Sequence, residues 1–159
     1  MAHQLELARY IDAPAEVVWD VLTDIGRADS TLSGVDSVEI LTPGAYREGF
    51  RWRETRKMLG KAATEEMWVT EVQPGQSTVV KAASGGADYT TRFTLTPSGD
   101  GTELRMFFGA ELQNPGWPAR LAMAVFGKLG ISAARKAMQQ DLYDIAAAAE
   151  GKARKGGQP

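Results

Sequence analysis

The sequence predicts an α+β fold with a seven-stranded antiparallel sheet, one long C-terminal helix and two short helices after the first strand. The first observation is that six segments between residues 35 and 112 have the composition of strands and are separated by short runs rich in turn residues. The second is that apolar residues after Pro118 recur with the period of a helix. Because the connections between the strands are short, neighbouring strands are expected to pair as antiparallel hairpins.

The amino-terminal segment predicts a strand followed by a short helix. Residues 3–11 alternate apolar and polar side chains, which indicates a half-buried strand. Pro14 suits the first position of a helix, where its missing N–H needs no partner, and Glu16 is favoured in the first turn by the helix dipole. We therefore expect a helix over residues 14–23, then a second short helix or helical loop that ends at Gly34.

The middle of the chain predicts six consecutive strands, each closed by turn residues. Proline presets the backbone angle of a turn, and glycine supplies the positive φ that several turn types need. Pro43-Gly44 and Pro74-Gly75 mark two such boundaries. The predicted strands cover residues 35–41, 49–57, 64–72, 78–83, 89–96 and 102–112.

A single helix of about 30 residues is predicted from Pro118 to Glu150. Gly127 and Gly130 lie inside it, and each costs about 1 kcal/mol relative to alanine. They indicate either a kink or break that divides the helix, or a place where missing side chains leave room for a ligand. Residues 1–150 then form one domain, and the Gly- and Lys-rich segment 151–159 is expected to be a disordered basic tail.

The composition excludes several classes of protein and site. The 159 residues contain no cysteine, which removes disulfides, thiol catalysis and thiolate metal sites, and the only histidine is His3. The 18 basic and 20 acidic residues give a net charge of −2, without the basic footprint of a nucleic-acid-binding protein. No apolar run is long enough for a membrane span, and the first residues lack the pattern of a signal peptide. We expect a soluble, cytoplasmic monomer or homodimer that binds no nucleic acid and is not stably inserted in a membrane.

Five segments of the chain resemble one known superfamily. They are IDAPAEVVWDVLTD (residues 11–24), GFRWRETR (49–56), EEMWVTEVQPG (65–75), GDGTELRMFF (99–108) and the C-terminal helix. Together they are similar to the SRPBCC superfamily, in its polyketide cyclase/dehydrase-like branch. The resemblance implies the helix-grip fold, in which a curved sheet wraps around the long helix and leaves an apolar cavity between them. Because the superfamily includes cyclases, START-type lipid carriers and birch-pollen-allergen-like binding proteins, it does not choose one function.

Strand register predicts which side chains face this cavity. The concave face of the sheet should carry the more apolar register of each strand, which is clear in the two final strands. The register of the strand 64–72 is ambiguous, and we favour Met67 and Val69 facing inward. The predicted ligand-binding residues are Phe50, Trp52, Met67, Tyr89, Thr91, Phe93, Met106, Phe108, Phe126 and Leu129.

The strand 49–57 adds charge to the apolar register. Glu54 and Arg56 continue the register of Phe50 and Trp52, so a carboxylate and a guanidinium would point inward, pair, and contact carbonyl or hydroxyl groups of a ligand. Alternatively, a bulge or the twisted sheet end would place them at the rim, in solvent. Glu54 and Arg56 are the candidate catalytic residues, because a desolvated carboxylate can accept a proton and a positioned arginine can stabilise an enolate.

The remaining acidic groups are interpreted as solvated charges. They are the pair Glu65-Glu66 and, on the C-terminal helix, Asp141 with Asp144. The sequence contains no phosphate-binding glycine loop, no dinucleotide motif and no carboxylate cluster at metal-ligand spacing. We therefore expect no cofactor and no metal.

Three functions remain open at this point. The first is binding of a small hydrophobic or aromatic ligand, lipid-like or polyketide-like, in the cavity. The second is a polyketide cyclase or dehydratase that performs an aldol-type cyclisation with Glu54 and Arg56. The third is an interaction module whose cavity is vestigial, which an exposed apolar patch at the sheet edge would favour.

Overall fold

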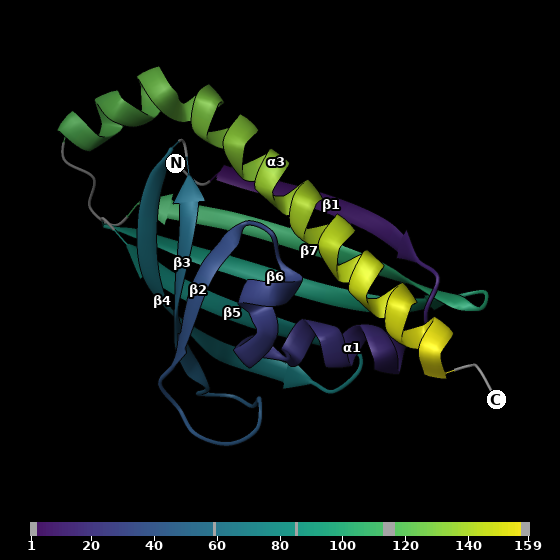
Figure 1. Cartoon of the computed structure of the whole chain (residues 1–159). Helices are drawn as coiled ribbons and strands as arrows, with labels where there is room; N and C mark the ends of the chain where they lie inside the picture. The colour runs from purple at the N-terminus through teal and green to yellow at the C-terminus, as the bar shows by residue number, and fades with distance from the viewer. Residues whose placement is uncertain (1–2, 59, 85, 113–116, 157–159) are drawn as a thin grey trace.

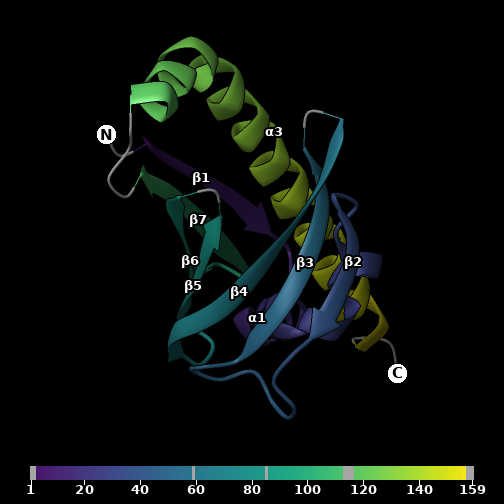
Figure 2. The ribbon, with the colours of Figure 1, turned by 90° about the vertical axis from the view of Figure 1, so that its left-hand side faces the viewer.

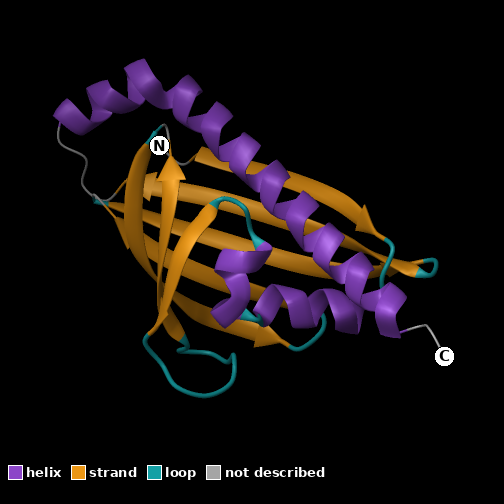
Figure 3. Ribbon diagram, in the orientation of Figure 1, coloured by secondary structure: helices purple, strands orange, loops and turns teal. Residues whose placement is uncertain are grey.

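The computed structural model describes residues 3–58, 60–84, 86–112 and 117–156, with side chains described for residues 4–57, 60–83, 86–111 and 130–156. Seven strands form one antiparallel sheet in the order β1-β7-β6-β5-β4-β3-β2, and a long helix crosses it (Figures 1 and 3). This confirms the predicted fold class. The strands are β1 (His3–Ile11), β2 (Val35–Ile40), β3 (Arg51–Met58), β4 (Lys61–Gln73), β5 (Ser77–Ser84), β6 (Ala87–Ser98) and β7 (Gly101–Leu112). The helices are α1 (Ala15–Thr23), the 3-10 turn η1 (Ile25–Arg27), α2 (Ala28–Thr31) and α3 (Trp117–Gly156).

The sheet is strongly curved. Figures 1 and 2 show β2, β3 and β4 turned away from the direction of β1, β6 and β7, so that the sheet forms a trough with α3 along its open side. The pairing shifts between Val35 and Ser37 in β2 and between Val69 and Glu71 in β4. Bulges of this kind bend a strand and increase its twist, which explains how a hairpin meander becomes concave.

The turns between the strands use the residues that the sequence analysis identified. Gly75, after Pro74, has a φ of 74° at the β4–β5 turn, and Gly99 has a φ of 58° at the β6–β7 turn. A side chain at either position would be strained in this left-handed region. The tight turns keep β4 to β7 adjacent, so alternate residues of each strand lie on the concave face.

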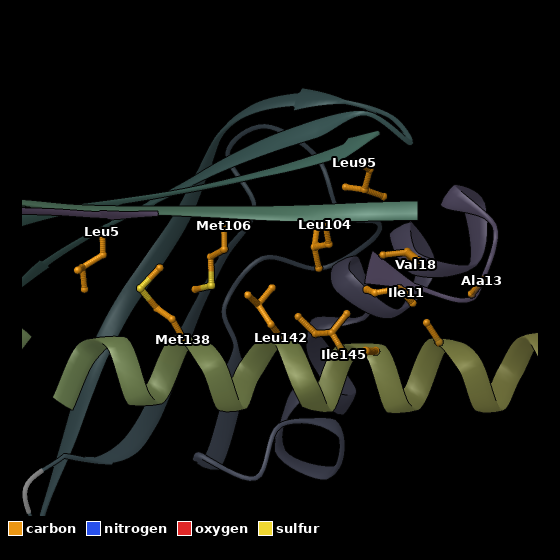
Figure 4. Packing of buried hydrophobic residues seen from close by; sticks show 12 residues of the cluster. Leu5, Ile11, Ala13, Val18, Leu95, Leu104, Met106, Met138, Leu142 and Ile145 are labelled. Carbon is orange, nitrogen blue, oxygen red and sulfur yellow. The ribbon is translucent and has the colours of Figure 1, made fainter. Parts of the chain in front are cut away.

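The main core lies between α3 and the β1–β7–β6 side of the sheet. Figure 4 shows Met138, Leu142 and Ile145 of α3 pointing toward the strands. Leu142 and Ile145 are each 3% exposed and belong to the same buried cluster as Leu104 of β7. Burying such side chains contributes about 1.5–3 kcal/mol each, so this cluster holds the helix on the sheet. The other buried members are Leu5, Ile11, Ala13, Val18, Leu95, Met106, Ala146 and Ala149.

Polar contacts also tie α3 to the loops that follow β1 and α2. Asp144 accepts hydrogen bonds from the backbone N–H and the hydroxyl of Ser33, at 2.9 and 2.8 Å. Glu150 accepts one from the backbone N–H of Asp12 at 2.9 Å. These contacts and the apolar cluster position the last half of the helix relative to the two edge strands of the sheet, β1 and β2.

The structure corrects three expectations about the helices. Pro14 is the N-cap of α1 and not its first helical residue. The long helix has 40 residues and not about 30; it runs without a break through Gly127 to Gly130, which the sequence left open, and Figure 1 shows it bent. Residues 151–156 continue α3 and do not form a disordered tail. Ala153 packs on the core, and basic residues in the last turn are favoured by the helix dipole, which together explain the extension.

No helix in the described part of the chain is long and apolar enough to cross a membrane.

Candidate functional site

A cavity of about 220 Å³ lies between the concave face of the sheet and α3. Five strands, β3 to β7, and α3 contribute to its wall, so it occupies the centre of the trough. Ala134 and Ala137 of α3 face it, and these small side chains leave space that a larger residue would fill. The lining residues are Glu54, Arg56, Ala63, Glu65, Met67, Val80, Ala82, Tyr89, Thr91, Met106, Phe108, Ala134, Ala137, Met138 and Asp141.

Three charged side chains form a bridge from the sheet to the helix within this wall. The terminal nitrogens of Arg56 donate to both carboxylate oxygens of Asp141, at 3.1 and 2.9 Å. The Arg56 Nε donates to Glu54 Oε1 at 2.5 Å, and Trp52 Nε1 donates to Glu54 Oε2 at 3.3 Å. Both carboxylates therefore have hydrogen-bond partners, as buried charges require. We call Glu54, Arg56 and Asp141 the ion bridge.

The two carboxylates of the ion bridge are buried and Arg56 is partly buried, and the ion bridge carries two acidic groups and one basic group. Glu54 is 8% exposed and Asp141 6% exposed. Burial raises the pKa of Asp141; Arg56 opposes this shift, whereas Glu54 and Asp144 add to it. Burial alone would lower the pKa of Arg56, but the charges and hydrogen bonds of Asp141 and Glu54 outweigh it and raise that pKa above its usual value. Two carboxylates around one guanidinium explain the raised pKa of Arg56, whereas burial is the largest cause of the raised pKa of Asp141.

Glu65 and Tyr89 extend the polar side of the cavity. Glu65 of β4 lies opposite Glu54 of β3 in the strand register, so their side chains share the concave face. Burial and the charge of Glu54 raise the pKa of Glu65, and Arg56 only partly opposes them. Burial and then Glu65 raise the pKa of Tyr89. Tyr89 also stacks on Phe108, with ring centroids 5.8 Å apart, which fixes its ring against the cavity wall.

A second, smaller cavity of about 110 Å³ adjoins the first. It lies toward α1 and α2, and the whole ion bridge belongs to the walls of both cavities. Tyr46, in its wall, shares a hydrogen bond of 2.8 Å with the hydroxyl of Thr78. Burial raises the pKa of Tyr46 to about 12, with the Thr78 hydrogen bond acting in the opposite direction, so this phenol stays protonated at neutral pH.

The structure places most of the predicted site residues around these two cavities. Glu54 and Arg56 point inward and pair, as the register hypothesis required, and are not at a solvated rim. Phe50 lies instead in a separate buried cluster with Trp52, Val69 and Val80. The side chains of Phe126 and Leu129 lie outside the described residues. The larger cavity is lined by the predicted residues Met67, Tyr89, Thr91, Met106 and Phe108, and the smaller one by Trp52 and Phe93 together with Met67, Thr91 and Met106.

The interpretation of Asp141 and Glu65 as solvated charges was wrong. Asp141 is buried against Arg56, and Glu65 is half-buried in the cavity wall. A signal for each was present in the sequence. Glu65 shares the strand register of Met67, and Asp141 follows Met138 by three positions, on the same face of the helix.

The described residues contain no group of three or more His, Cys, Asp or Glu side chains arranged to hold a metal ion.

Comparison with known protein families agrees with this geometry. Residues 2–150 match the family described as polyketide cyclase/dehydrase and lipid transport. The chain belongs to this family. The predicted resemblance to the SRPBCC superfamily is thereby confirmed, and its helix-grip fold is typical of hydrophobic-ligand-binding or polyketide cyclase proteins. No curated protein matches the sequence significantly.

Solved structures show how widely this fold is shared. The ZhuI aromatase/cyclase from Streptomyces sp. R1128 is 17% identical, with a TM-score of 0.82 and coverage of 100% of both chains. A Thermus thermophilus protein, TTHA0849, is 21% identical, with a TM-score of 0.72 and coverage of 98% of this chain and 100% of its own. A START superfamily protein from Mycobacterium smegmatis is 16% identical, with a TM-score of 0.67 and coverage of 96% and 98%. At these identities the similarity shows a common helix-grip fold.

Proposed function

We propose that the protein binds a small hydrophobic or aromatic ligand, lipid-like or polyketide-like, in the cavity between the sheet and α3. The observation that carries this proposal is a cavity of about 220 Å³ whose wall is mostly apolar and whose charged groups are gathered in one place. Binding sites for small molecules combine an apolar lining with a few polar groups that fix orientation. This open space favours ligand binding over the alternative of an interaction module with a vestigial cavity.

The apolar part and the charged part of the cavity wall have different roles in this proposal. Met67, Met106 and Met138 surround the apolar part, and flexible thioethers adapt to irregular ligand shapes. Arg56 uses three of its five N–H groups on Glu54 and Asp141, which leaves two for a carbonyl or hydroxyl oxygen of the ligand. The apolar wall therefore supplies affinity and the ion bridge supplies orientation.

Native mass spectrometry of the protein purified from its own host without denaturation tests this proposal. We expect a bound species with a mass of a few hundred daltons. The variant Ala137→Leu fills the cavity and should lose that species. Ala147→Leu places the same side chain on an exposed position of α3 and should retain it. Absence of a bound species from the wild type, or its retention in Ala137→Leu, would contradict binding in this cavity.

A second candidate function, aldol-type cyclisation of a poly-β-ketone, is favoured by carboxylates next to Arg56 in the same cavity. In this reaction a base removes a proton from a carbon between two carbonyls. The resulting enolate attacks another carbonyl carbon to form the C–C bond, and the new alkoxide then takes up a proton. Arg56 would stabilise the enolate oxygen, and Glu54 would be the base. Tyr89 and Thr91 would hydrogen-bond the remaining oxygens.

Two matched variants separate catalysis from binding. If Glu54 is the base, Glu54→Gln should abolish turnover of a poly-β-ketone substrate and barely change its affinity. Glu65→Gln removes the cavity carboxylate that lies outside the ion bridge and tests whether Glu65 is the base instead, because its raised pKa suits proton transfer. Equal losses of turnover and affinity in Glu54→Gln would exclude a catalytic role for Glu54.

A further inference from the structure

The charges around the larger cavity do not balance. Its lining includes three carboxylates, Glu54, Glu65 and Asp141. Among the described residues of that lining, Arg56 is the only one with a basic side chain. The wall thus carries an excess of negative charge when its carboxylates are ionised, and it remains negative even with Glu65 protonated.

Arg56 is also occupied by the protein itself. Its Nε bonds Glu54, and both terminal nitrogens bond Asp141 in a bidentate pair. A ligand carboxylate could reach only the two N–H groups that remain, beside the carboxylates of Glu54 and Asp141. Their negative charges repel it, whereas an uncharged oxygen at the same place is not repelled.

No other described cation compensates inside the cavity. Lys61 is the basic residue of this strand register nearest to Glu65, but it lies at the β3–β4 turn and is exposed. Water and salt screen a charge in that position. Burial is the largest cause of the raised pKa values of Glu65 and Asp141, and the carboxylate of Glu54 adds to both shifts.

We propose that the cavity selects uncharged ligands that carry hydroxyl or amide groups and rejects ligands whose polar end is a carboxylate. This inference rests on the proposed function and narrows its ligand class. An uncharged polar group can accept from the two remaining N–H groups of Arg56 and donate to Glu65 without breaking the ion bridge. Free fatty acids and aromatic acids are excluded by the same charges that orient a phenol or an alcohol. Glu65 is the specificity-determining residue, since it faces the cavity without being part of the ion bridge.

A pair of ligands with the same shape tests this inference. 2-Naphthamide and 2-naphthoate differ in charge and have almost the same size, and each is titrated into the protein in an isothermal titration calorimeter at pH 7. We expect the amide to bind at least about tenfold more tightly than the carboxylate, because the anion meets unscreened negative charge in a partly desolvated site. Ala137→Leu should abolish saturable binding of both ligands, which locates them in the cavity.

Two glutamate variants identify the source of the discrimination. Glu65→Gln removes the inward carboxylate and should reduce the amide-to-carboxylate preference at least about threefold. Glu66→Gln is the matched control, because Glu66 is exposed on the other face of β4, where its Oε2 lies 3.8 Å from Nη1 of Arg51. It changes the net charge by the same amount and should leave the preference unchanged.

The outcomes separate this inference from the function on which it rests. Equal or tighter binding of 2-naphthoate by the wild type overturns the charge selection while the binding function stands. Equal effects of Glu65→Gln and Glu66→Gln overturn the role of Glu65. Saturable binding of neither probe counts against the binding function itself, and the inference then falls with it.

Discussion

The two halves of the interface between α3 and the sheet differ in what their side chains leave between them. Toward the C-terminus, Leu142, Ile145 and Ala149 are at most 3% exposed and pack into the main core. Toward the middle of the helix, Ala134 and Ala137 stand over the cavity of about 220 Å³. The helix and the sheet are continuous across both regions. Side-chain volume on one helix face therefore decides where this fold is core and where it is a site.

The two halves of the interface also differ in whether they contain buried charged side chains. The closed half contains no buried charge among its described residues, and its buried polar side chain, Thr102, donates to the Ala13 carbonyl at 2.8 Å, whereas the open half contains the ion bridge. A buried charge is tolerated there because each partner satisfies the other. The cavity thus depends on the bridge for its integrity as well as for its chemistry, and the first prediction tests that dependence.

The largest expected effect comes from removing the central cation of the bridge. Arg56→Met leaves Glu54 and Asp141 buried without their partner, and loss of one partner of a buried pair costs about 3–5 kcal/mol. Urea denaturation monitored by circular dichroism measures this loss in the free energy of unfolding.

Arg53→Met is the matched control for this variant. Arg53 lies on the same strand with its side chain 50% exposed, and it pairs with Glu39 at 3.4 Å on the outer face. A loss of at most about 0.5 kcal/mol is expected from an exposed pair of this kind. Similar losses in the two variants would show that the ion pairs on the inner face of β3 contribute no more to stability than the ion pair on its outer face.

An intermediate effect should distinguish the filled half of the interface from the hollow half. Ala146 is 2% exposed in the core, so Ala146→Leu should overpack it and cost about 1–3 kcal/mol. Ala137→Leu adds the same atoms over the cavity and should change stability by less, while it abolishes ligand binding. Thermal unfolding of both variants makes the comparison. If Ala137→Leu were the more destabilising change, the cavity could not be open space in solution.

The smallest expected effect is a pH dependence caused by Glu65. The pKa of Glu65 is raised in the folded state above its ordinary value of 4.5, so the native protein holds its proton more tightly than the unfolded chain does. Stability is therefore lost as pH rises from that ordinary value through the raised pKa. The free energy of unfolding of Glu65→Gln minus that of the wild type should therefore increase as pH rises through this window. Below the window this difference should not change with pH. Denaturation midpoints measured between pH 4 and pH 7 test the sign, and a wild type that gains stability over Glu65→Gln with rising pH would refute it.

Strand register made much of the site predictable from the sequence. The inward position of Glu54 and Arg56 follows from the register that they share with Phe50 and Trp52, because every second side chain of a strand points to the same face. The same rule placed Tyr89 and Phe108 in the cavity wall. Where a bulge shifts the pairing, as between Val69 and Glu71, the rule applies only to each side of the bulge separately.

The helix contribution was much harder to predict. Which face of α3 meets the sheet, and at what height, depends on contacts between residues far apart in the chain, such as those of Asp144 with Ser33. The partnership of Arg56 with Asp141 is another such contact, and a charged residue on a helix is usually exposed. Prediction therefore treated Asp141 as solvated. The ion bridge belongs to the walls of both cavities, so the full set of lining residues could not be derived from strand register.

The pairing of β1 with β7 affects how the chain folds during its synthesis. Leu5 lies opposite Phe108, so β1, which is made before the other six strands of this sheet, has no partner until β7 has been synthesised. Until then, the apolar register of β1 is exposed, and nascent segments of this kind depend on chaperones or on rapid completion of the chain. Refolding of the full chain is correspondingly expected in the millisecond-to-second range typical of sheets with distant pairings, which stopped-flow fluorescence of the tryptophans can time. Among the strands of this sheet, β1 is therefore made first but reaches its place only after β7 is available.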